Sequence, residues 1–468
     1  MLKNKSLMFA LATVIFLSSC KGKSVTQSSP MEGRQPAIFD SNVSDSKKSE
    51  VSAPSAPVAS TAPSVAASAA PATSGATADL AYKEEKSVSS APISNSVLAP
   101  YIPPQPVKQL SGGSTDDNDK FLEYIDYVRK MSPSFSDGRD VVKADTSERY
   151  IISLTDKDGK PLNNADITVS SDSLELFKAK SYSNGKVLFF PKALRAVERD
   201  CQQMDCSNKY PNNLKNYRIT VMKDGIKTVK DFDNTTTNWS IKTENSRNQQ
   251  QGITLDLTFL IDATGSMGDE IASIQKTIKD VSDRIQQLTP KPEKIRYSLV
   301  SFRDRGDEYR TKRYDFTSTL SFFQDSLNEL KAGGGGDYPE SVNEGLKVAI
   351  NEVNWSDNNT NAIRLVFLVG DAPPHLDYSD DTKYNISMSD AVKKGIKIYS
   401  LAASGLDSRG EYIFRQLSQY TSAKFLFITY GGDAQNSGST THQVGAFKEN
   451  NLDSLIVDTV KNELTSNN

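Results

Sequence analysis

The stretch ITLDLTFLIDATGSM, residues 253–267, decides the fold of this chain. It begins with alternating apolar and polar residues, becomes wholly apolar at 259–261, and turns small and polar from Asp262 onward. A strand with such an apolar end is typical of a parallel sheet that is covered on both faces. An amphipathic helix is predicted directly after it, over 269–288, where apolar residues recur three and four apart.

The same alternation of strand and helix continues to the C-terminus. Further strands are predicted at 297–302, 363–369, 396–401 and 424–429, and further helices at 320–330, 339–353, 387–394, 410–420 and 452–464. Strands that alternate with helices predict a mostly parallel sheet with helices on both faces. Residues 251–468 are therefore expected to form a doubly wound, Rossmann-like α/β domain.

Binding sites of doubly wound folds form where strands end. Three predicted loops of this kind are rich in oxygen ligands, namely DATGSM at 262–267, GGGGDYPE at 333–340 and GDAPPH at 370–375. Carboxylates and hydroxyls are the ligands that hard divalent cations prefer. If Asp262 stood alone, it would more simply cap the helix that follows, but three such loops together favour a metal site.

The three loops resemble the metal-ion-dependent adhesion site (MIDAS) of von Willebrand factor A (VWA) domains, in the order of that family. The resemblance implies that Asp262, Thr264 and Ser266 form the first-loop triplet and that Asp371 is the late aspartate. The family usually supplies a threonine from the middle loop, and Asp337 is the matching position here. The resemblance also implies bound Mg²⁺, with Ca²⁺ or Mn²⁺ as alternatives, and a protein partner whose acidic side chain completes the metal shell. A third carboxylate should hold the metal more tightly but leave less positive charge for that partner.

Other residues near these loops have simpler interpretations. His375 is expected to be a packed loop histidine, because the family's metal shell consists of oxygen atoms. The tripeptide Arg305-Gly306-Asp307 resembles an integrin-recognition motif, but its position just after a strand suggests a structural loop. Arg303 and Asp304 are expected to brace the loops beside the metal.

The first residues, 1–19, have the pattern of a bacterial signal peptide. Lys3 and Lys5 precede an apolar run at 7–17, which is too short to span a bilayer comfortably. The sequence LSSC that follows resembles a lipobox, which implies that Cys20 is acylated and becomes the mature N-terminus. An ordinary cleaved signal peptide with an incidental cysteine is the alternative.

Between Cys20 and the α/β domain, the sequence predicts two further segments. Residues 20–117 are rich in Ser, Ala and Pro without any apolar period, and are expected to form a disordered linker. Residues 118–250 contain short strand-like runs separated by turns, and resemble carboxypeptidase-regulatory or Ig-like envelope modules with a small β-sandwich. Cys201 and Cys206 are expected to form a disulfide in an exported protein, with a metal site as the rival interpretation.

Composition and motifs favour a binding protein over an enzyme. The net charge of -3 and pI of about 5.7 argue against nucleic acid as a partner. Lys21 stands where an aspartate would favour inner-membrane retention in lipoproteins, so an outer-membrane or cell-surface lipoprotein is expected. The leading hypothesis is metal-dependent adhesion or complex assembly, without catalysis. The alternatives are a structural envelope scaffold in which metal only stabilises the domain, and a phosphoryl-transfer enzyme of the haloacid dehalogenase type that would use Asp262 as its nucleophile.

Overall fold

A computed structural model describes residues 110–202, 204–211, 213–246, 252–357, 361–429 and 442–467, together with the backbone of 38–40. The predicted signal peptide, the predicted lipidation residue Cys20 and most of the predicted linker lie outside these described residues. Among the helices of the described ranges, none has the length and apolar character that a membrane crossing requires.

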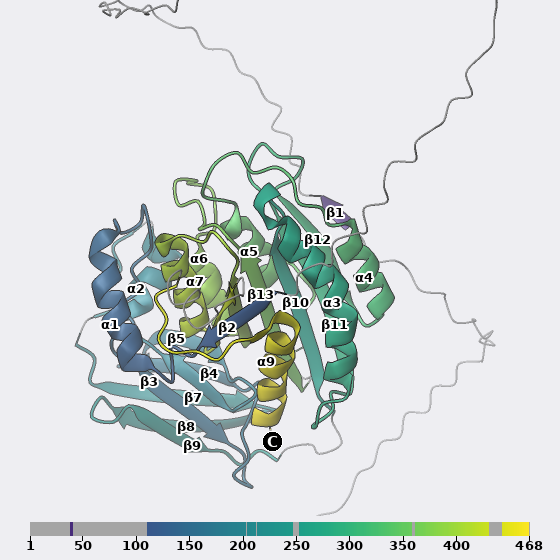
Figure 1. The fold of residues 1–468 in the computed structure, drawn as a ribbon. Helices are drawn as coiled ribbons and strands as arrows, with labels where there is room; N and C mark the ends of the chain where they lie inside the picture. Colours follow the sequence, from purple (N-terminus) through teal and green to yellow (C-terminus); the bar gives the residue numbers. More distant parts are fainter. Residues whose placement is uncertain are drawn as a thin grey trace, which may run out of the picture. The chain divides into compact units, whose positions relative to one another are not determined.

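The C-terminal half of the chain is built around one large, mostly parallel sheet (Figure 1). Its strands span Ile38–Asp40 (β1), Ser111–Thr115 (β2), Thr254–Asp262 (β10), Lys294–Phe302 (β11), Thr311–Thr317 (β12), Ala362–Gly370 (β13), Ile396–Ala402 (β14), Phe425–Thr429 (β15) and Asn450–Asn451 (β16). Their order is β1-β12-β11-β10-β13-β14-β15-β2-β16. Five neighbouring strands, β11, β10, β13, β14 and β15, pair in parallel. Antiparallel strands flank them, β12 and β1 on one side and β2 and β16 on the other. The predicted α/β fold is thereby confirmed.

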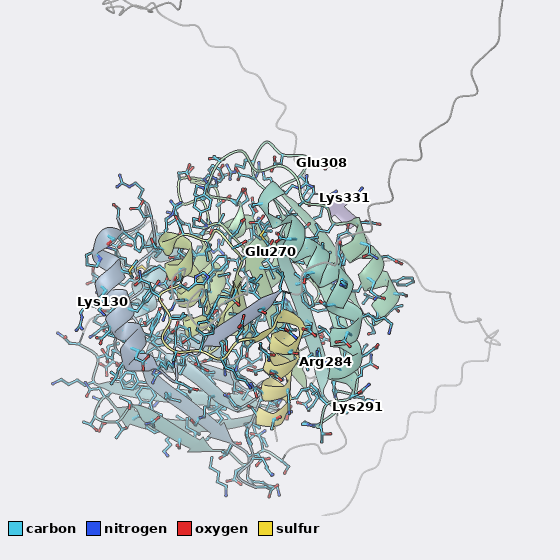
Figure 2. All side chains as sticks on the ribbon, viewed as in Figure 1. Lys130, Glu270, Arg284, Lys291, Glu308 and Lys331 are labelled. Carbon is cyan, nitrogen blue, oxygen red and sulfur yellow. A yellow bond between two sulfur atoms is a disulfide. The ribbon has the colours of Figure 1, made fainter. Side chains whose placement is uncertain are left out.

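Helices cover both faces of this sheet, as the alternation of side chains along each strand requires. They span Gly268–Gln286 (α3), Leu320–Glu329 (α4), Val342–Asn351 (α5), Tyr384–Lys394 (α6), Ser408–Tyr420 (α7) and Leu452–Ser466 (α9). Side chains of α3, α4 and α9 share one apolar core with Phe259, whereas those of α5, α6 and α7 share another with the adjacent Leu260. Arg284, labelled in Figure 2, ties α3 to α9 through a 2.8 Å ion pair with Asp453. Burial on both faces explains why β10 is apolar at its end.

The expected β-sandwich precedes the α/β domain. Its strands span Tyr150–Thr155 (β3), Asp166–Ser171 (β4), Leu174–Lys180 (β5), Lys186–Phe189 (β6), Asn216–Lys223 (β7), Ile226–Asp233 (β8) and Asn238–Lys242 (β9). They form two sheets, in the orders β6-β3-β9 and β5-β4-β7-β8. Trp239 is fully buried at the centre, where its ring stacks on Tyr150 at 4.3 Å and on Phe232 at 5.3 Å. Two helices accompany the sandwich, α1 at Phe121–Met131 and α2 at Leu194–Val197, and Cys201 and Cys206 are joined as a disulfide just after α2.

Strand β2 corrects the predicted linker boundary at residue 117. Ser111–Thr115 pairs antiparallel with β15 of the α/β domain, so the ordered region begins before residue 111. The segment gave no strand signal because SGGST contains no apolar residue. Its glycines serve packing, since a Cβ at Gly113 would lie 2.5 Å from the rings of both Phe427 and Phe447.

The β-sandwich and the α/β domain are also joined by a buried polar network. Glu463 of α9 accepts hydrogen bonds of 2.6 Å from Lys397 and Tyr399 of β14, and from Ser183 in the sandwich. Burial alone would raise the pKa of Glu463, but the Lys397 ammonium and the three hydrogen bonds hold it below its usual range. The sequence predicted a domain boundary at residue 250. The parts on either side of it share buried contacts, and one apolar core runs through both.

The Glu463 network provides a test of this junction. Replacing Glu463 by Gln leaves the buried Lys397 ammonium without a counter-charge, which should lower the free energy of unfolding by about 3–5 kcal/mol. The measurement is urea denaturation of the whole chain in a Cys20→Ser background. Asp458→Asn, an exposed change on the same helix, is the matched control and should shift the midpoint little. Equal midpoints for both variants would show that the network does not stabilise the fold.

Candidate metal centre

Asp262 ends the central strand β10 and lies fully buried at the carboxyl edge of the sheet. Its Oδ1 accepts hydrogen bonds from the backbone N–H of Thr264, at 2.9 Å, and from the Thr264 hydroxyl, at 2.7 Å. Its Oδ2 is buried and has no hydrogen-bond partner among the described residues. Because a buried carboxylate oxygen without a partner is costly, this atom is free to accept a cation.

The electrostatics of Asp262 agree with its geometry. The pKa of this carboxyl is raised to about 7: burial is the largest cause, the nearby carboxylates of Asp371 and Asp304 add to the rise, and the hydrogen bonds from Thr264 oppose it. Several acidic groups therefore share a small buried volume. A divalent cation would compensate the burial and the mutual repulsion together.

The third loop converges on the first. Asp371 follows β13, the neighbour of β10 in the sheet, and is also buried. Burial raises its pKa, whereas a hydrogen bond with the Ser266 hydroxyl lowers it in part. Gly370 lies between them, and a Cβ there would make ordinary contact, at 3.6 Å, with Oδ2 of Asp262. Loops 262–267 and 370–375 thus bring together two carboxylates and two hydroxyls.

The glycine-rich middle loop crosses over the first loop. Gly265 donates a backbone hydrogen bond to Gly334 at 3.1 Å, and Gly333 donates one to Ala263 at 3.0 Å. Gly334 and Gly335 both have positive φ, of 76° and 75°. A Cβ at Gly335 would lie 2.9 Å from Oε1 of Glu340, so glycine is required there by both conformation and space.

Glu340, which the sequence did not single out, is the middle-loop carboxylate beside Asp262. It is 5% exposed, and its Oε2 is buried without a hydrogen-bond partner among the described residues. Its pKa is raised to about 9, mainly by burial and in addition by the carboxylates of Asp262, Asp304, Asp307 and Asp371. Its position could have been suspected from its place at the end of the loop, directly before α5.

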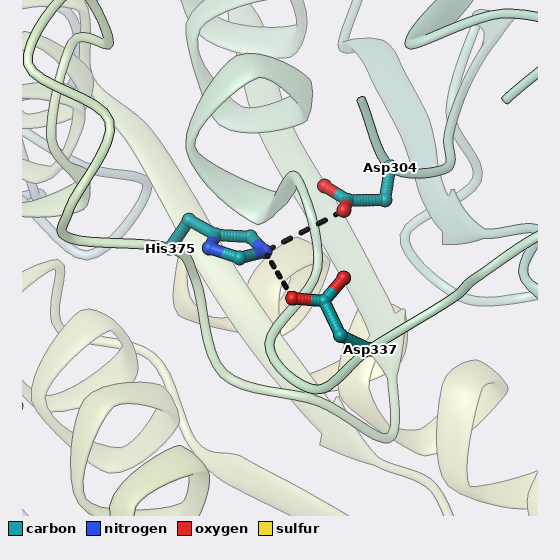
Figure 3. Close-up of side chains that lie close together, drawn as sticks. All are labelled: Asp304, Asp337 and His375. Atoms are coloured by element: carbon teal, nitrogen blue, oxygen red, sulfur yellow. Dashed lines mark ion pairs between the residues drawn. The ribbon is translucent and has the colours of Figure 1, made fainter. Parts of the chain in front are cut away.

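Asp337, the middle-loop ligand expected from the sequence, contacts His375. Its side chain is 65% exposed, and its carboxylate is 4.0 Å from Nε2 of His375 (Figure 3). The structure therefore groups Asp337 with His375 and Asp304 rather than with the buried Oδ2 of Asp262. His375 is buried, as expected of a packed histidine.

Arg303 and Asp304 brace the loops as expected. Arg303 donates hydrogen bonds to the carbonyls of Ala263, at 3.1 Å, and of Lys331, at 2.8 Å. Asp304 is buried and accepts a 2.9 Å hydrogen bond from the Ser341 hydroxyl. The first and middle loops are in this way held to the loop that follows β11.

The Arg305-Gly306-Asp307 tripeptide is engaged within the protein. The Arg305 guanidinium pairs with Asp381 at 2.6 Å and with Asp380 at 2.8 Å, and lies 3.8 Å from the centre of the Tyr378 ring. Asp307 Oδ2 accepts hydrogen bonds from the backbone N–H groups of Asp304 and Gly335. Both charged side chains of the motif therefore serve the local loop structure.

The donor set suits a hard divalent cation. The residues that could hold it offer only carboxylate and hydroxyl oxygens, which Mg²⁺, Ca²⁺ and Mn²⁺ prefer. Thr264 and Ser266 point their hydroxyl protons at carboxylates, so their oxygen lone pairs remain for a cation. The set comprises Asp262, Thr264, Ser266, Glu340 and Asp371.

Comparison with known proteins agrees with the fold and with the loops. Residues 256–444 match the family model of the von Willebrand factor A domain. Alpha-protein kinase vwkA of Dictyostelium discoideum is 26% identical over 223 residues, which cover 45% of this chain and 33% of that protein. Human von Willebrand factor A domain-containing protein 7 is 37% identical over 97 residues, which cover 20% of this chain and 10% of that protein. The chain thus spans a third or less of the length of these relatives.

Two solved structures are among those that match this chain. Proximal thread matrix protein 1 from the mussel byssus, with a zinc-occupied MIDAS motif, is 17% identical, with a TM-score of 0.30 and 46% of each chain covered. The pilus adhesin SpaC from Lactobacillus rhamnosus GG is 13% identical, with a TM-score of 0.31, and the match covers 54% of this chain and 33% of that one. Residues 256–444 of this chain are thus similar to a von Willebrand factor A domain in sequence, and the sheet order and the three converging loops are consistent with that similarity.

Proposed function

We propose that this chain binds a divalent cation at the carboxyl edge of its central sheet and uses it to hold a protein partner. The observation that carries the proposal is the pair of buried, unpartnered oxygens, Oδ2 of Asp262 and Oε2 of Glu340. Mg²⁺ requires about six oxygen ligands and keeps some waters. Thr264, Ser266 and Asp371 would complete the protein's share of such a shell.

The proposed ligand set differs from the one expected from the sequence only in the residue that the middle loop supplies. Glu340 takes the place expected for Asp337, because it is buried beside Asp262 and Asp337 is exposed. Asp262, Asp371 and Glu340 carry more negative charge than a divalent cation neutralises. We therefore expect a partner's acidic side chain to bind more weakly here than at a centre with threonine in the middle loop.

The partner would approach over the exposed rim of the loops. Ser266, the glycines from Gly334 to Gly336 and Tyr338 are exposed, and the Tyr338 hydroxyl accepts a 2.9 Å hydrogen bond from the backbone N–H of Asp407. An exposed tyrosine held at one end offers contact area at little entropic cost, as binding surfaces often require. This rim supports binding to a protein surface.

Burial of Asp262 supports binding rather than catalysis. A phosphoryl-transfer nucleophile must reach the phosphorus atom in line with the leaving group. The Asp262 side chain has no exposed surface, and one of its oxygens is committed to Thr264. We accordingly propose a non-enzymatic role for the domain.

We further propose that Cys20 anchors the chain by acylation to the outer membrane or cell surface, with the Ser/Ala/Pro-rich linker as a tether. The lipobox-like sequence LSSC supports this location. The disulfide between Cys201 and Cys206 fits an exported protein, because disulfides persist in oxidising compartments.

Metal titration tests the proposed centre directly. The Cys20→Ser chain should bind a single Mg²⁺, Ca²⁺ or Mn²⁺ ion in calorimetry, and an ion at 100 times its Kd should stabilise the fold by about 2.7 kcal/mol. Asp262→Ala and Glu340→Gln should each abolish or sharply weaken both effects. Asp325→Asn, at an exposed position on α4, should leave them unchanged. Binding that survives in Asp262→Ala would place the ion elsewhere.

The raised pKa values predict a pH dependence of metal affinity. A cation binds the ionised carboxylates, so it must displace protons from Asp262 below about pH 7 and from Glu340 below about pH 9. Affinity should therefore rise with pH up to about 9, by about tenfold per pH unit for each proton displaced. Glu340→Gln should remove the rise above about pH 7 and keep the rise below it. A flat profile in the wild type would contradict the proposed ligands.

Chelation separates adhesion from a scaffold role. Immobilised Cys20→Ser chain should retain an envelope protein in Mg²⁺ and release it in EDTA, while circular dichroism remains unchanged. Asp262→Ala should retain nothing under either condition. Retention that is equal in Mg²⁺ and EDTA would favour the scaffold alternative, in which the metal only stabilises the domain.

A further inference from the structure

A second group of ligand atoms lies next to the loops of the proposed centre. Asp304, Asp337 and His375 each contribute one atom to a cluster in which all three atoms lie within 4.8 Å of one another. Figure 3 shows the His375 ring pointing Nε2 at both carboxylates, 3.5 Å from Asp304 Oδ2 and 4.0 Å from Asp337 Oδ2. The side chains of Asp304 and His375 are buried, and that of Asp337 reaches the surface.

The two ring nitrogens of His375 face different partners. Nδ1 lies 2.9 Å from Oδ1 of Asp377, a carboxylate that can only accept a proton when ionised. Nδ1 therefore donates to Asp377, which leaves Nε2 as the ring atom that could bind a cation in the cluster. A histidine that donates one nitrogen to a carboxylate and presents the other is the usual arrangement of an imidazole that binds metal.

The spacing of the cluster suits an ion with short bonds to nitrogen and oxygen. Zn²⁺ binds histidine and carboxylate ligands at about 2.0–2.2 Å with tetrahedral geometry, which separates neighbouring ligand atoms by about 3.3–3.6 Å. The 3.5 Å separation of Nε2 and Asp304 Oδ2 falls in this range. Asp337 is slightly more distant, but its exposed side chain can close that gap.

Tyr378 provides the alternative explanation of the cluster. Its ring stacks on His375 at 4.1 Å, and its hydroxyl lies 3.3 Å from Nε2 and 3.4 Å from Asp304 Oδ2. One hydroxyl proton cannot serve both acceptors well, and both distances are long for a hydrogen bond from oxygen. The Tyr378 hydroxyl is thus a weak partner for both Nε2 of His375 and Oδ2 of Asp304, and it does not by itself account for the cluster.

We propose that Asp304, Asp337 and His375 form a second metal site that takes a Zn²⁺-like transition ion. The site shares no ligand with the proposed Mg²⁺ centre of Asp262 and Glu340, and its imidazole selects a softer ion. An ion held there would tie the glycine-rich loop, through Asp337, to the loop that follows β13. Three protein ligands leave a fourth position open beside the exposed rim.

The test is a Zn²⁺ titration of the Cys20→Ser chain with excess Mg²⁺ present. Zn²⁺ should bind a single site in the wild type, and Co²⁺ in its place should show the visible absorption of a tetrahedral site with a nitrogen ligand. His375→Ala should abolish this binding. Asp337→Asn, an exposed change that does not endanger the fold, should weaken it by at least about 10-fold and up to about 100-fold, whereas Asp325→Asn should leave it unchanged.

Asp262→Ala distinguishes the two sites. The second site predicts that Asp262→Ala still binds Zn²⁺ even though it has lost Mg²⁺ binding, and this result would hold if the proposed Mg²⁺ centre failed. Loss of Zn²⁺ in Asp262→Ala with retention in His375→Ala would show that zinc occupies the first centre. Absence of Zn²⁺ binding in the wild type would show that the cluster is a hydrogen-bonded packing network only. Either of these two results overturns the proposal.

Discussion

Burying a carboxylate costs free energy unless hydrogen bonds or a cation compensate for it, and the carboxyl edge of the central sheet buries several together. Asp262 is held there because β10 is the central strand, with β11 and β13 paired on either side along almost its whole length. The loops that follow these strands converge for the same reason. The positive-φ glycines, the Arg303 brace and the Ser266–Asp371 contact all follow from the need to bring chain segments close to one fully buried acid.

The rest of the molecule holds this edge steady. Apolar helices on both faces fix the sheet, and the β-sandwich is attached to it through the shared apolar core and through Glu463. A metal site of the proposed kind needs loops placed on rigid elements, since displaced ligands lose metal affinity. The sandwich therefore contributes to the support of the sheet that carries the loops.

The alternation of strand and helix made the α/β domain predictable, because amphipathic periods survive in the sequence of each element. The positions of Asp262, Thr264, Ser266 and Asp371 at one edge of the sheet could be predicted because these residues lie at or shortly after the ends of buried strands. Glu340 could not be separated from Asp337 in this way. Both lie in one loop, and only the backbone path set by Gly334 and Gly335 decides which carboxylate points inward. Strand β2 could not be predicted from the sequence for a related reason. The small residues of SGGST fit against the Phe427 and Phe447 rings, and the segment has no apolar pattern of its own.

Strand β2 also sets an order of assembly. It is the first strand of the described region beyond residue 110 to be synthesised, yet its partner β15 is among the last. Contacts between segments so distant in the chain form slowly, because a long loop must close before they contribute any free energy. The edge of the sheet beyond β15 consequently stays open until nearly the whole polypeptide has emerged. This late closure would postpone completion of the domain until synthesis of the chain is almost finished.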